Sequence, residues 1–173
     1  FSQKGPGAMH APWLISLAAG LVVGGLSQFS RLCTVGGFRD LFLFKKSILI
    51  FGYLAVLIGV FVVNISFGNF HLGFENQPIA HTDGLWNFLG MALAGFCSVL
   101  LGGCPLRQLI MTGEGNSDSA VTVLGLAAGA AFAHNFGLAA TGAGPTLNGE
   151  IAVGVGFVVA LIIAILNTKR VNA

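Results

Sequence analysis

Five long apolar stretches, separated by short polar segments, restrict this chain to very few possible folds. They cover residues 12–30, 47–67, 85–101, 120–140 and 151–166. A helix of about 20 residues, rising about 1.5 Å per residue, crosses a bilayer core of about 30 Å. Because backbone groups in lipid must be hydrogen-bonded internally, each stretch is predicted to be helical. The sequence therefore predicts an all-α integral membrane protein with about five transmembrane helices.

The composition supports a membrane protein and argues against a soluble one. Of 173 residues, 55% are hydrophobic and 8% are charged, whereas about a quarter of the residues in a typical soluble domain are charged. The net charge of +2 is too small to suggest a nucleic-acid partner. We expect residues 1–11 to form a tail or linker and residues 12–170 to form a single membrane domain.

A break follows the third apolar stretch. Two glycines, of which the second is Gly103, interrupt the helical pattern, and Pro105 suits the first position of a new helix. The sequence predicts a helix, a break at Cys104 and a short helix with Arg107 one turn inside it. A helix N-terminus carries partial positive charge and free N–H groups, so this place could receive an anion. The alternative is a Gly-Pro turn with a buried cysteine.

A second break follows the first apolar stretch. Residues 27–40 are polar but interleaved with apolar residues, and glycines at Gly36 and Gly37 follow Cys33. We predict a re-entrant or short helix here, which is tolerated at membrane depth where protein or water surrounds it.

The two breaks suggest a weak internal repeat. We expect two helix–short helix–helix units, at about 12–67 and 85–140, and a final helix at 151–167. Paired broken helices at corresponding positions are the best sequence indication of a transport site.

The three cysteines are Cys33, Cys97 and Cys104, an odd number that cannot pair completely. Neither a C-x-x-C motif nor a zinc-ligand spacing is present, so we predict free thiols, no metal site and no cofactor. A thiol is a weak donor and a soft acceptor, which suits a polarisable sulfur atom better than phosphate. Packing is the alternative for Cys33 and Cys104, and it is the favoured role for Cys97.

Four further polar residues are weaker candidates for the site. Arg31 more often marks the cytoplasmic surface than binds a ligand. Glu114 is expected to cap a helix or bind backbone amides. His134 and Asn135 lie within an alanine-rich stretch, where an interhelical hydrogen bond is favoured over a role in proton or substrate binding.

The distribution of lysine and arginine predicts the orientation. With five crossings, one side of the membrane receives Arg31, Arg39, Lys45, Lys46, Arg107, Lys169 and Arg170, and the other side receives Lys4. Because basic residues accumulate on the cytoplasmic side, we expect an outside N-terminus and a cytoplasmic C-terminus. His10, His71 and His81 then lie outside, and Arg39 and Asp40 form a local ion pair. An outside N-terminus without a signal peptide suits the second half of a longer protein.

Three segments resemble a known family. Residues 101–110 with 113–116, residues 30–40 and residues 132–137 are similar to the YeeE/YedE sulfur-transport family. The likeness covers about residues 24–149 and is greatest to the YedE branch of proposed selenium transporters.

The resemblance implies a bacterial inner-membrane importer with two pseudo-symmetric halves, in which short helices form an hourglass. It assigns Cys33 and Cys104 to a relay that contacts the sulfur of an anion such as thiosulfate, with the helix ends after each stabilising its charge. The position of Arg107 beside the break makes it the candidate side chain for the same role. Gly36, Gly37, Gly103 and Pro105 belong to the same motifs. The chain matches the C-terminal half, which implies a missing N-terminal half or a second copy. A cytoplasmic sulfurtransferase of the TusA/SirA type is the implied partner.

Three functional hypotheses therefore compete. The first is a transporter of a small sulfur- or selenium-containing anion, which is not an enzyme. The second is a membrane thiol oxidoreductase, which requires two cysteines close enough to bridge. The third is a non-conducting structural subunit whose cysteines only pack.

Overall fold

The computed structural model describes residues 11–68, 70, 72–73 and 81–171 of the chain. The described part contains seven helices and no strand, apart from one isolated bridge between Thr141 and Gly144. The predicted all-α fold is confirmed. The expectations for Lys4, His10 and His71 lie outside the described residues.

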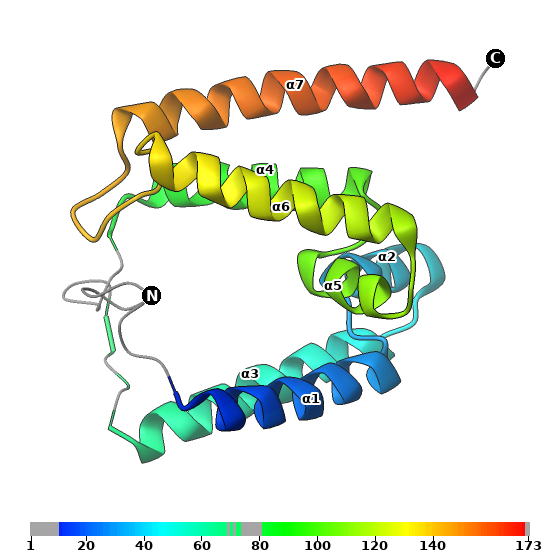
Figure 1. The fold of residues 1–173 in the computed structure, drawn as a ribbon, viewed down its shortest axis with the longest axis vertical. Helices are drawn as coiled ribbons and strands as arrows, with labels where there is room; N and C mark the ends of the chain where they lie inside the picture. Colours follow the sequence, from blue (N-terminus) through cyan, green and yellow to red (C-terminus); the bar gives the residue numbers. More distant parts are fainter. Residues whose placement is uncertain (1–10, 69, 71, 74–80, 172–173) are drawn as a thin grey trace.

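Each of the two short helices lies between two long ones in the order of the chain (Figure 1). The long helices are α1 (Trp13–Ser30), α3 (Ile48–Ser66), α4 (Gly84–Leu100), α6 (Ser117–Asn135) and α7 (Leu147–Val171). The short helices are α2 (Thr34–Phe44) and α5 (Pro105–Gly113). Successive long helices run in opposite directions, and both short helices lie at the same end of them. The predicted breaks at Cys33 and Cys104 are therefore present.

In the described residues, four helical stretches are long and apolar enough to cross a membrane: Trp13–Phe44, Ile48–Ser66, Gly84–Gly113 and Leu147–Thr168. Helix α6 has the same length as α3, 19 residues. The mean hydropathy of α6 is too low for a membrane-crossing helix, because its interior is rich in alanine and glycine and its ends carry Asp118, His134 and Asn135. The chain is a multi-pass membrane protein, and a fifth crossing by α6 remains a prediction.

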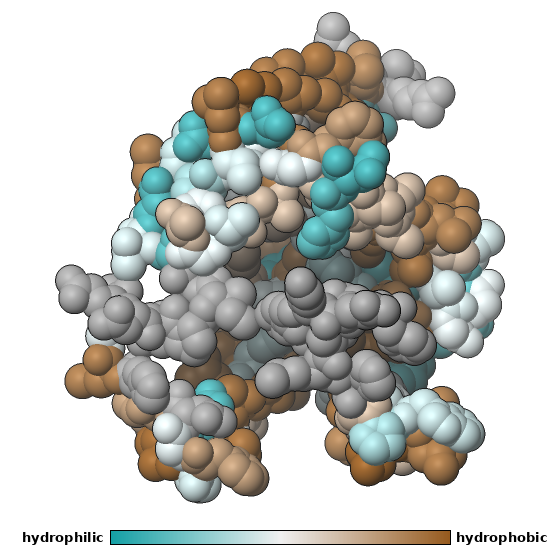
Figure 2. Space-filling model, turned by 60° about the vertical axis from the view of Figure 1, so that its left-hand side comes forward, coloured by the Kyte–Doolittle hydropathy of each residue, from teal (hydrophilic) through white to brown (hydrophobic). Residues whose placement is uncertain are grey.

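The burial pattern is the reverse of that in a soluble domain. Most large apolar side chains are exposed, and they cover much of the surface visible in Figure 2. Among the described residues other than glycine, the buried ones are Ser27, Cys33, Ser98, Cys104, Gln108, Ser119 and Ala160. Lipid is as apolar as leucine, so apolar side chains face outward without cost and polar groups turn toward protein.

The short helices are the centres of packing. Helix α2 packs against α3 and α4, and α5 packs against α6 and α1, whereas α7 packs against α4. The close approach of α2 to α3 explains why glycine suits position 37, because a Cβ at Gly37 would lie 3.3 Å from Cδ1 of Ile50 on α3.

Helix α4 ends in a turn that directs the chain into α5. The Gly102 N–H donates to the Val99 carbonyl at 3.1 Å, and the Gly103 N–H donates to the Ser98 carbonyl, also at 3.1 Å. Gly102 has a φ of 73°, in the left-handed region. These two bonds around a left-handed residue form a Schellman motif, which satisfies carbonyls at the end of the helix.

Helix α1 ends in the same motif with a different residue in the strained position. The Arg31 N–H donates to the Gln28 carbonyl and the Leu32 N–H to the Ser27 carbonyl, both at 3.2 Å. Arg31 takes the left-handed conformation, with φ 51°. In both turns the cysteine comes two positions after the left-handed residue. The internal repeat thus has a matching backbone register around Cys33 and Cys104.

The described basic residues before α7 lie in α2, α5 or the turns next to them, at one end of the long helices. Helix α7 also finishes at this end. This arrangement is the one-sided charge distribution on which the predicted orientation depends, and the orientation itself remains a prediction.

Candidate functional site

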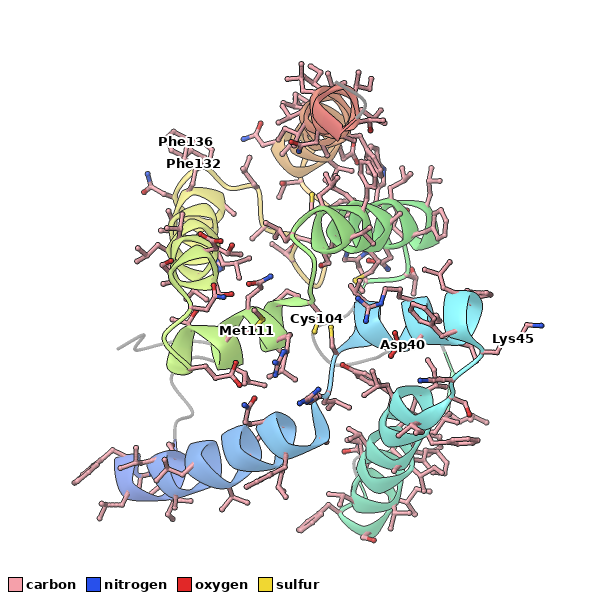
Figure 3. The ribbon with its side chains drawn as sticks, turned by 90° about the vertical axis from the view of Figure 1, so that its right-hand side faces the viewer. Asp40, Lys45, Cys104, Met111, Phe132 and Phe136 are labelled. Atoms are coloured by element: carbon pink, nitrogen blue, oxygen red, sulfur yellow. The ribbon has the colours of Figure 1, made fainter. Side chains whose placement is uncertain are left out.

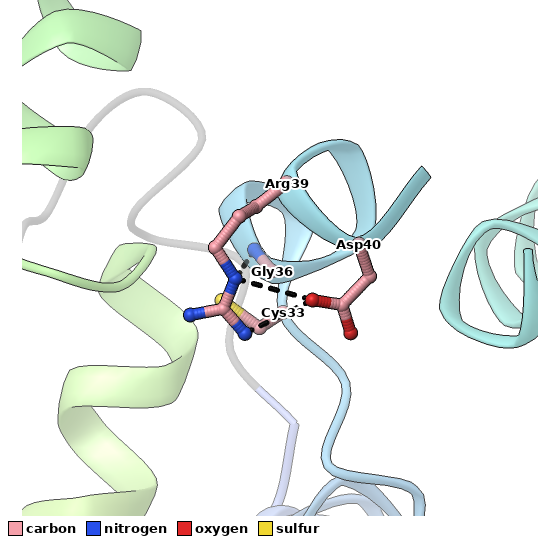
Figure 4. Close-up of polar contacts among 4 residues, drawn as sticks. All are labelled: Cys33, Gly36, Arg39 and Asp40. Carbon is pink, nitrogen blue, oxygen red and sulfur yellow. Dashed lines mark hydrogen bonds and ion pairs between the residues drawn. The ribbon is translucent and has the colours of Figure 1, made fainter. Parts of the chain in front are cut away.

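Cys33 is the N-cap of α2. Its backbone is extended, with φ −154°, and its Sγ accepts a hydrogen bond from the Gly36 N–H at 3.4 Å (Figure 4). The thiol occupies the position where a serine or aspartate oxygen commonly accepts this bond. Since a Cβ at Gly36 would lie 3.4 Å from the Cβ of Cys33, glycine lets the helix begin close to the thiol.

Cys104 is the N-cap of α5, and Pro105 occupies the start of that helix. The cysteine side chain makes no complete capping bond. Its thiol nevertheless lies close to the backbone N–H groups of Arg107 and Thr34 and to the Cys33 and Thr34 side chains. The two cysteines, far apart in sequence, are therefore neighbours.

Two helix N-termini meet at the two thiols. Cys33 is 8% exposed and Cys104 is 6% exposed, and both are free. Seen along the long helices, Cys104 lies centrally, where α2 and α5 meet (Figure 3). Each N-terminus has unpaired N–H groups and partial positive charge, so their convergence favours a small anion. The thiols add soft, polarisable contacts beside these donors.

Two hydroxyl groups complete this centre. The Thr34 hydroxyl donates to the Tyr53 oxygen at 2.8 Å, which joins α2 to α3. The Tyr53 side chain also lies close to Cys104. Sequence reasoning missed both residues. The available signal was Tyr53, the single tyrosine of the chain, which lies in an otherwise apolar stretch.

Two cavities adjoin the thiol centre. One of about 780 Å³ lies between α2, α4 and the start of α5, and its lining includes Cys104, Pro105 and Arg39. Another of about 590 Å³ lies between α2 and α3, and its lining includes Tyr53. Thr34 and Phe38 line both cavities. The N-terminal half of α2 therefore separates the two spaces.

The Arg107 side chain points away from the thiols into a polar network. Its Nη1 donates to Oε1 of Gln28 at 3.0 Å, and its Nη2 lies 3.7 Å from Oε2 of Glu114. The Gln28 amide also donates to Glu114. This network joins the end of α1 to α5. Arg107 thus reaches the thiol centre through its backbone N–H, while its guanidinium holds the two helices together.

The expected ion pair between Arg39 and Asp40 is confirmed. Nε and Nη2 of Arg39 donate to Oδ1 of Asp40 at 3.1 and 3.0 Å (Figure 4). The Arg39 side chain is 59% exposed, and Arg39 lines the same cavity as Cys104. Arg39 is therefore a basic side chain in the lining of the cavity that Cys104 also lines. The sequence did not predict this position, because the adjacent Asp40 suggested only a local ion pair.

Gly103 and Gln108 stabilise the break before Cys104. Gly103 is buried, and Nε2 of Gln108 donates to the Leu101 carbonyl at 3.0 Å. A Cβ at Gly103 would lie 3.4 Å from that amide nitrogen. Gln108, which sequence reasoning also missed, therefore fixes the turn that places Cys104.

Four of the weaker candidates lie apart from the thiols. Arg31 ends α1, and Glu114 binds Arg107 and Gln28. His134 and Asn135 are exposed at the end of α6 and make no side-chain hydrogen bond to any described residue. The expected interhelical bond from this pair is thus absent from the described part of the chain.

Cys97 is half-buried and lies within α4. Among the described residues, no group of three His, Cys, Asp or Glu side chains could hold a metal ion.

A sequence model of a protein family described as sulphur transport matches residues 29–170. This chain is a member of the sulphur transport family. The resemblance to the YeeE/YedE sulfur-transport proteins is thereby confirmed. The matched region includes all three cysteines, both short helices and the long helices, except for most of α1 and the last residue of α7.

One curated relative is the thiosulfate transporter TsuA of Escherichia coli K12. The two sequences are 30% identical over 111 residues, which is 62% of this chain and 30% of the relative. The aligned region thus spans less than a third of the length of TsuA. No solved structure matches the chain.

Proposed function

We propose that this member of the sulphur transport family forms part of a membrane pathway for a small sulfur-bearing anion such as thiosulfate. The supporting observation is the proximity of Cys33 and Cys104, both buried, at the meeting point of two helix N-termini. A terminal sulfur atom can accept a hydrogen bond from one thiol and pass to the next without leaving this centre.

The charge of the anion is stabilised in this proposal by backbone N–H groups. Those of Gly36, Arg107 and Thr34 face the thiols. A guanidinium so close would bind the anion strongly and slow its release, whereas partial charges allow both entry and departure. The paired state of the Arg107 side chain supports this role for its N–H.

The orientation and partners are also part of the proposal. We place the chain in the bacterial inner membrane with the C-terminus in the cytoplasm, because the basic residues gather at one end of the helices. The remainder of a longer protein or a second copy would complete the pathway. A TusA/SirA-like sulfurtransferase would receive the sulfur. The orientation is tested by fusing to the C-terminus a reporter that is active only in the cytoplasm. An inactive reporter would place the C-terminus on the outer side instead.

The decisive experiment measures uptake of labelled thiosulfate by cells that carry the full-length protein. Replacing either Cys33 or Cys104 by alanine should reduce uptake at least about tenfold, since each removes a contact to the anion. Cys97→Ala is the matched control, because Cys97 is absent from the lining of both cavities, and it should retain uptake. Parallel measurements with labelled selenium compounds show whether the protein carries sulfur anions, selenium species or both.

A second candidate function is favoured by the same proximity of the two thiols. An oxidoreductase needs two cysteines that can bridge, and Cys33 and Cys104 are neighbours. Normal uptake by both alanine variants, together with loss of a thiol–disulfide cycle, would support the enzyme and contradict transport. Normal uptake without any redox change would instead support a structural role.

A further inference from the structure

A tyrosine inside the first third of a membrane helix needs a reason. Helix α3 is the most apolar of the candidate spans, with mean hydropathy 2.7, and Tyr53 is the single tyrosine of the chain. A buried or lipid-facing phenol requires a hydrogen-bond partner. Tyr53 finds one in the Thr34 hydroxyl at 2.8 Å, and its own side chain lies close to Cys104.

The donors in this pair can be counted. The Thr34 hydroxyl donates to the Tyr53 oxygen, which uses the single proton of Thr34. Tyr53 keeps its own O–H as a donor. Because its oxygen already accepts a bond, that O–H is polarised and is a stronger donor than an isolated phenol.

Other polar side chains that line the two cavities have partners of their own. The Ser98 hydroxyl donates to the Ala94 carbonyl at 2.8 Å, and Arg39 is paired with Asp40. Thr34 lines both cavities, with Cys104 in the lining of one and Tyr53 in that of the other. The hydroxyl pair therefore lies at the border between the cavities, beside a thiol.

We propose that the Tyr53 O–H, positioned and polarised by the Thr34 hydroxyl, binds an oxygen atom of the anion while Cys33 and Cys104 contact its terminal sulfur, so that the site selects oxygenated sulfur anions. This inference rests on the proposed function. Thiols are soft and contact sulfur well, but they cannot distinguish thiosulfate from hydrosulfide. Hydroxyl donors are hard, and they can make that distinction because only thiosulfate carries oxygen acceptors.

The test uses the full-length protein, thiosulfate uptake and hydrosulfide as the oxygen-free competitor. The variants are Tyr53→Phe and Thr34→Val, each of which removes a hydroxyl with little change of shape. Thr122→Val is the matched control, because its hydroxyl bonds only to the Asp118 carbonyl on α6, outside both cavities.

The proposal expects Tyr53→Phe and Thr34→Val to raise the KM for thiosulfate about tenfold or more. The first variant removes the donor to the anion, and the second removes the hydroxyl that positions and polarises that donor. The maximal rate and inhibition by hydrosulfide should change less than about twofold, as should every quantity in Thr122→Val. A KM within twofold of that of Thr122→Val in both variants would overturn the proposal. Equal weakening of thiosulfate and hydrosulfide would also overturn it, since a lost oxygen contact must discriminate.

Cys104→Ala in the same assay separates the two levels of the argument. If it loses uptake while both hydroxyl variants keep their KM, the oxygen-binding role fails and the proposed transport function stands. If Cys104→Ala itself transports thiosulfate normally, the proposed function fails.

Discussion

Gly102 offers a measurable test of how the thiol centre is built. It is the left-handed residue of the turn between α4 and α5, with φ 73°, two residues before Cys104. A Cβ added there would meet no atom within 4 Å, so Gly102→Ala introduces backbone strain without a steric clash. The left-handed conformation costs an L-residue about 1–2 kcal/mol, which corresponds to a roughly 5- to 30-fold loss in the ratio of folded to unfolded protein.

The assay is thermal unfolding of the purified protein in detergent, followed by circular dichroism at one fixed scan rate. A loss of about 1–2 kcal/mol lowers Tm by a few degrees in a protein of this size. Gly125→Ala on α6 is the matched control, because this glycine has open space around it and no left-handed φ. Alanine there should leave Tm unchanged or raise it, since alanine favours a helix by about 0.5–1 kcal/mol over glycine.

The reasoning is refuted if Gly102→Ala unfolds at or above the temperature of Gly125→Ala. A lower Tm in Gly102→Ala should be accompanied by reduced thiosulfate uptake, because the same turn positions Cys104.

Three further predictions concern stability and the polar network. Lys45 ends α2 in the left-handed conformation, with φ 53°, so Lys45→Gly should stabilise the protein by roughly 0.5–1 kcal/mol; an unchanged or lower Tm would contradict this. Asn116 caps α6 through a 2.9 Å bond from the Ser119 N–H, and Asn116→Ala should cost about 1 kcal/mol in chemical unfolding, whereas no loss would show that the cap is dispensable. Arg107→Gln removes an ion pair at the protein surface but keeps the backbone N–H, so uptake should fall by less than in Cys104→Ala; an equal loss would mean that the guanidinium itself binds the anion.

The helices were predictable because their signals are local. Apolar stretches of spanning length, a proline at the first helical position and paired glycines after α4 each act within a few residues. The breaks at Cys33 and Cys104 could be predicted for this reason. The weak point was α6, where alanine and glycine give enough length but too little hydropathy to identify a membrane span.

The composition of the site was only partly predictable because it depends on contacts between distant segments. The two cysteines were expected to cooperate, but sequence spacing gives no distance between them. Tyr53 could be recognised as unusual, yet its partner Thr34 follows from the packing of α2 on α3. Arg107 was expected to face an anion, whereas its side chain is paired with Glu114, the residue that follows α5. Only the fold shows which end of a long side chain faces the centre.

The packing of the short helices has a mechanical consequence. Among the described residues, α1, α3, α4 and α6 each lean on α2 or α5, the two segments that begin at the thiols. A long helix that tilts to match a thinner or thicker bilayer therefore acts as a lever on the distance between Cys33 and Cys104. Uptake by the full-length protein in vesicles of graded acyl-chain length should pass through an optimum. Uptake that does not vary with chain length would show that helix tilt does not change the distance between the two thiols. In this view, bilayer thickness sets the distance between the two thiols.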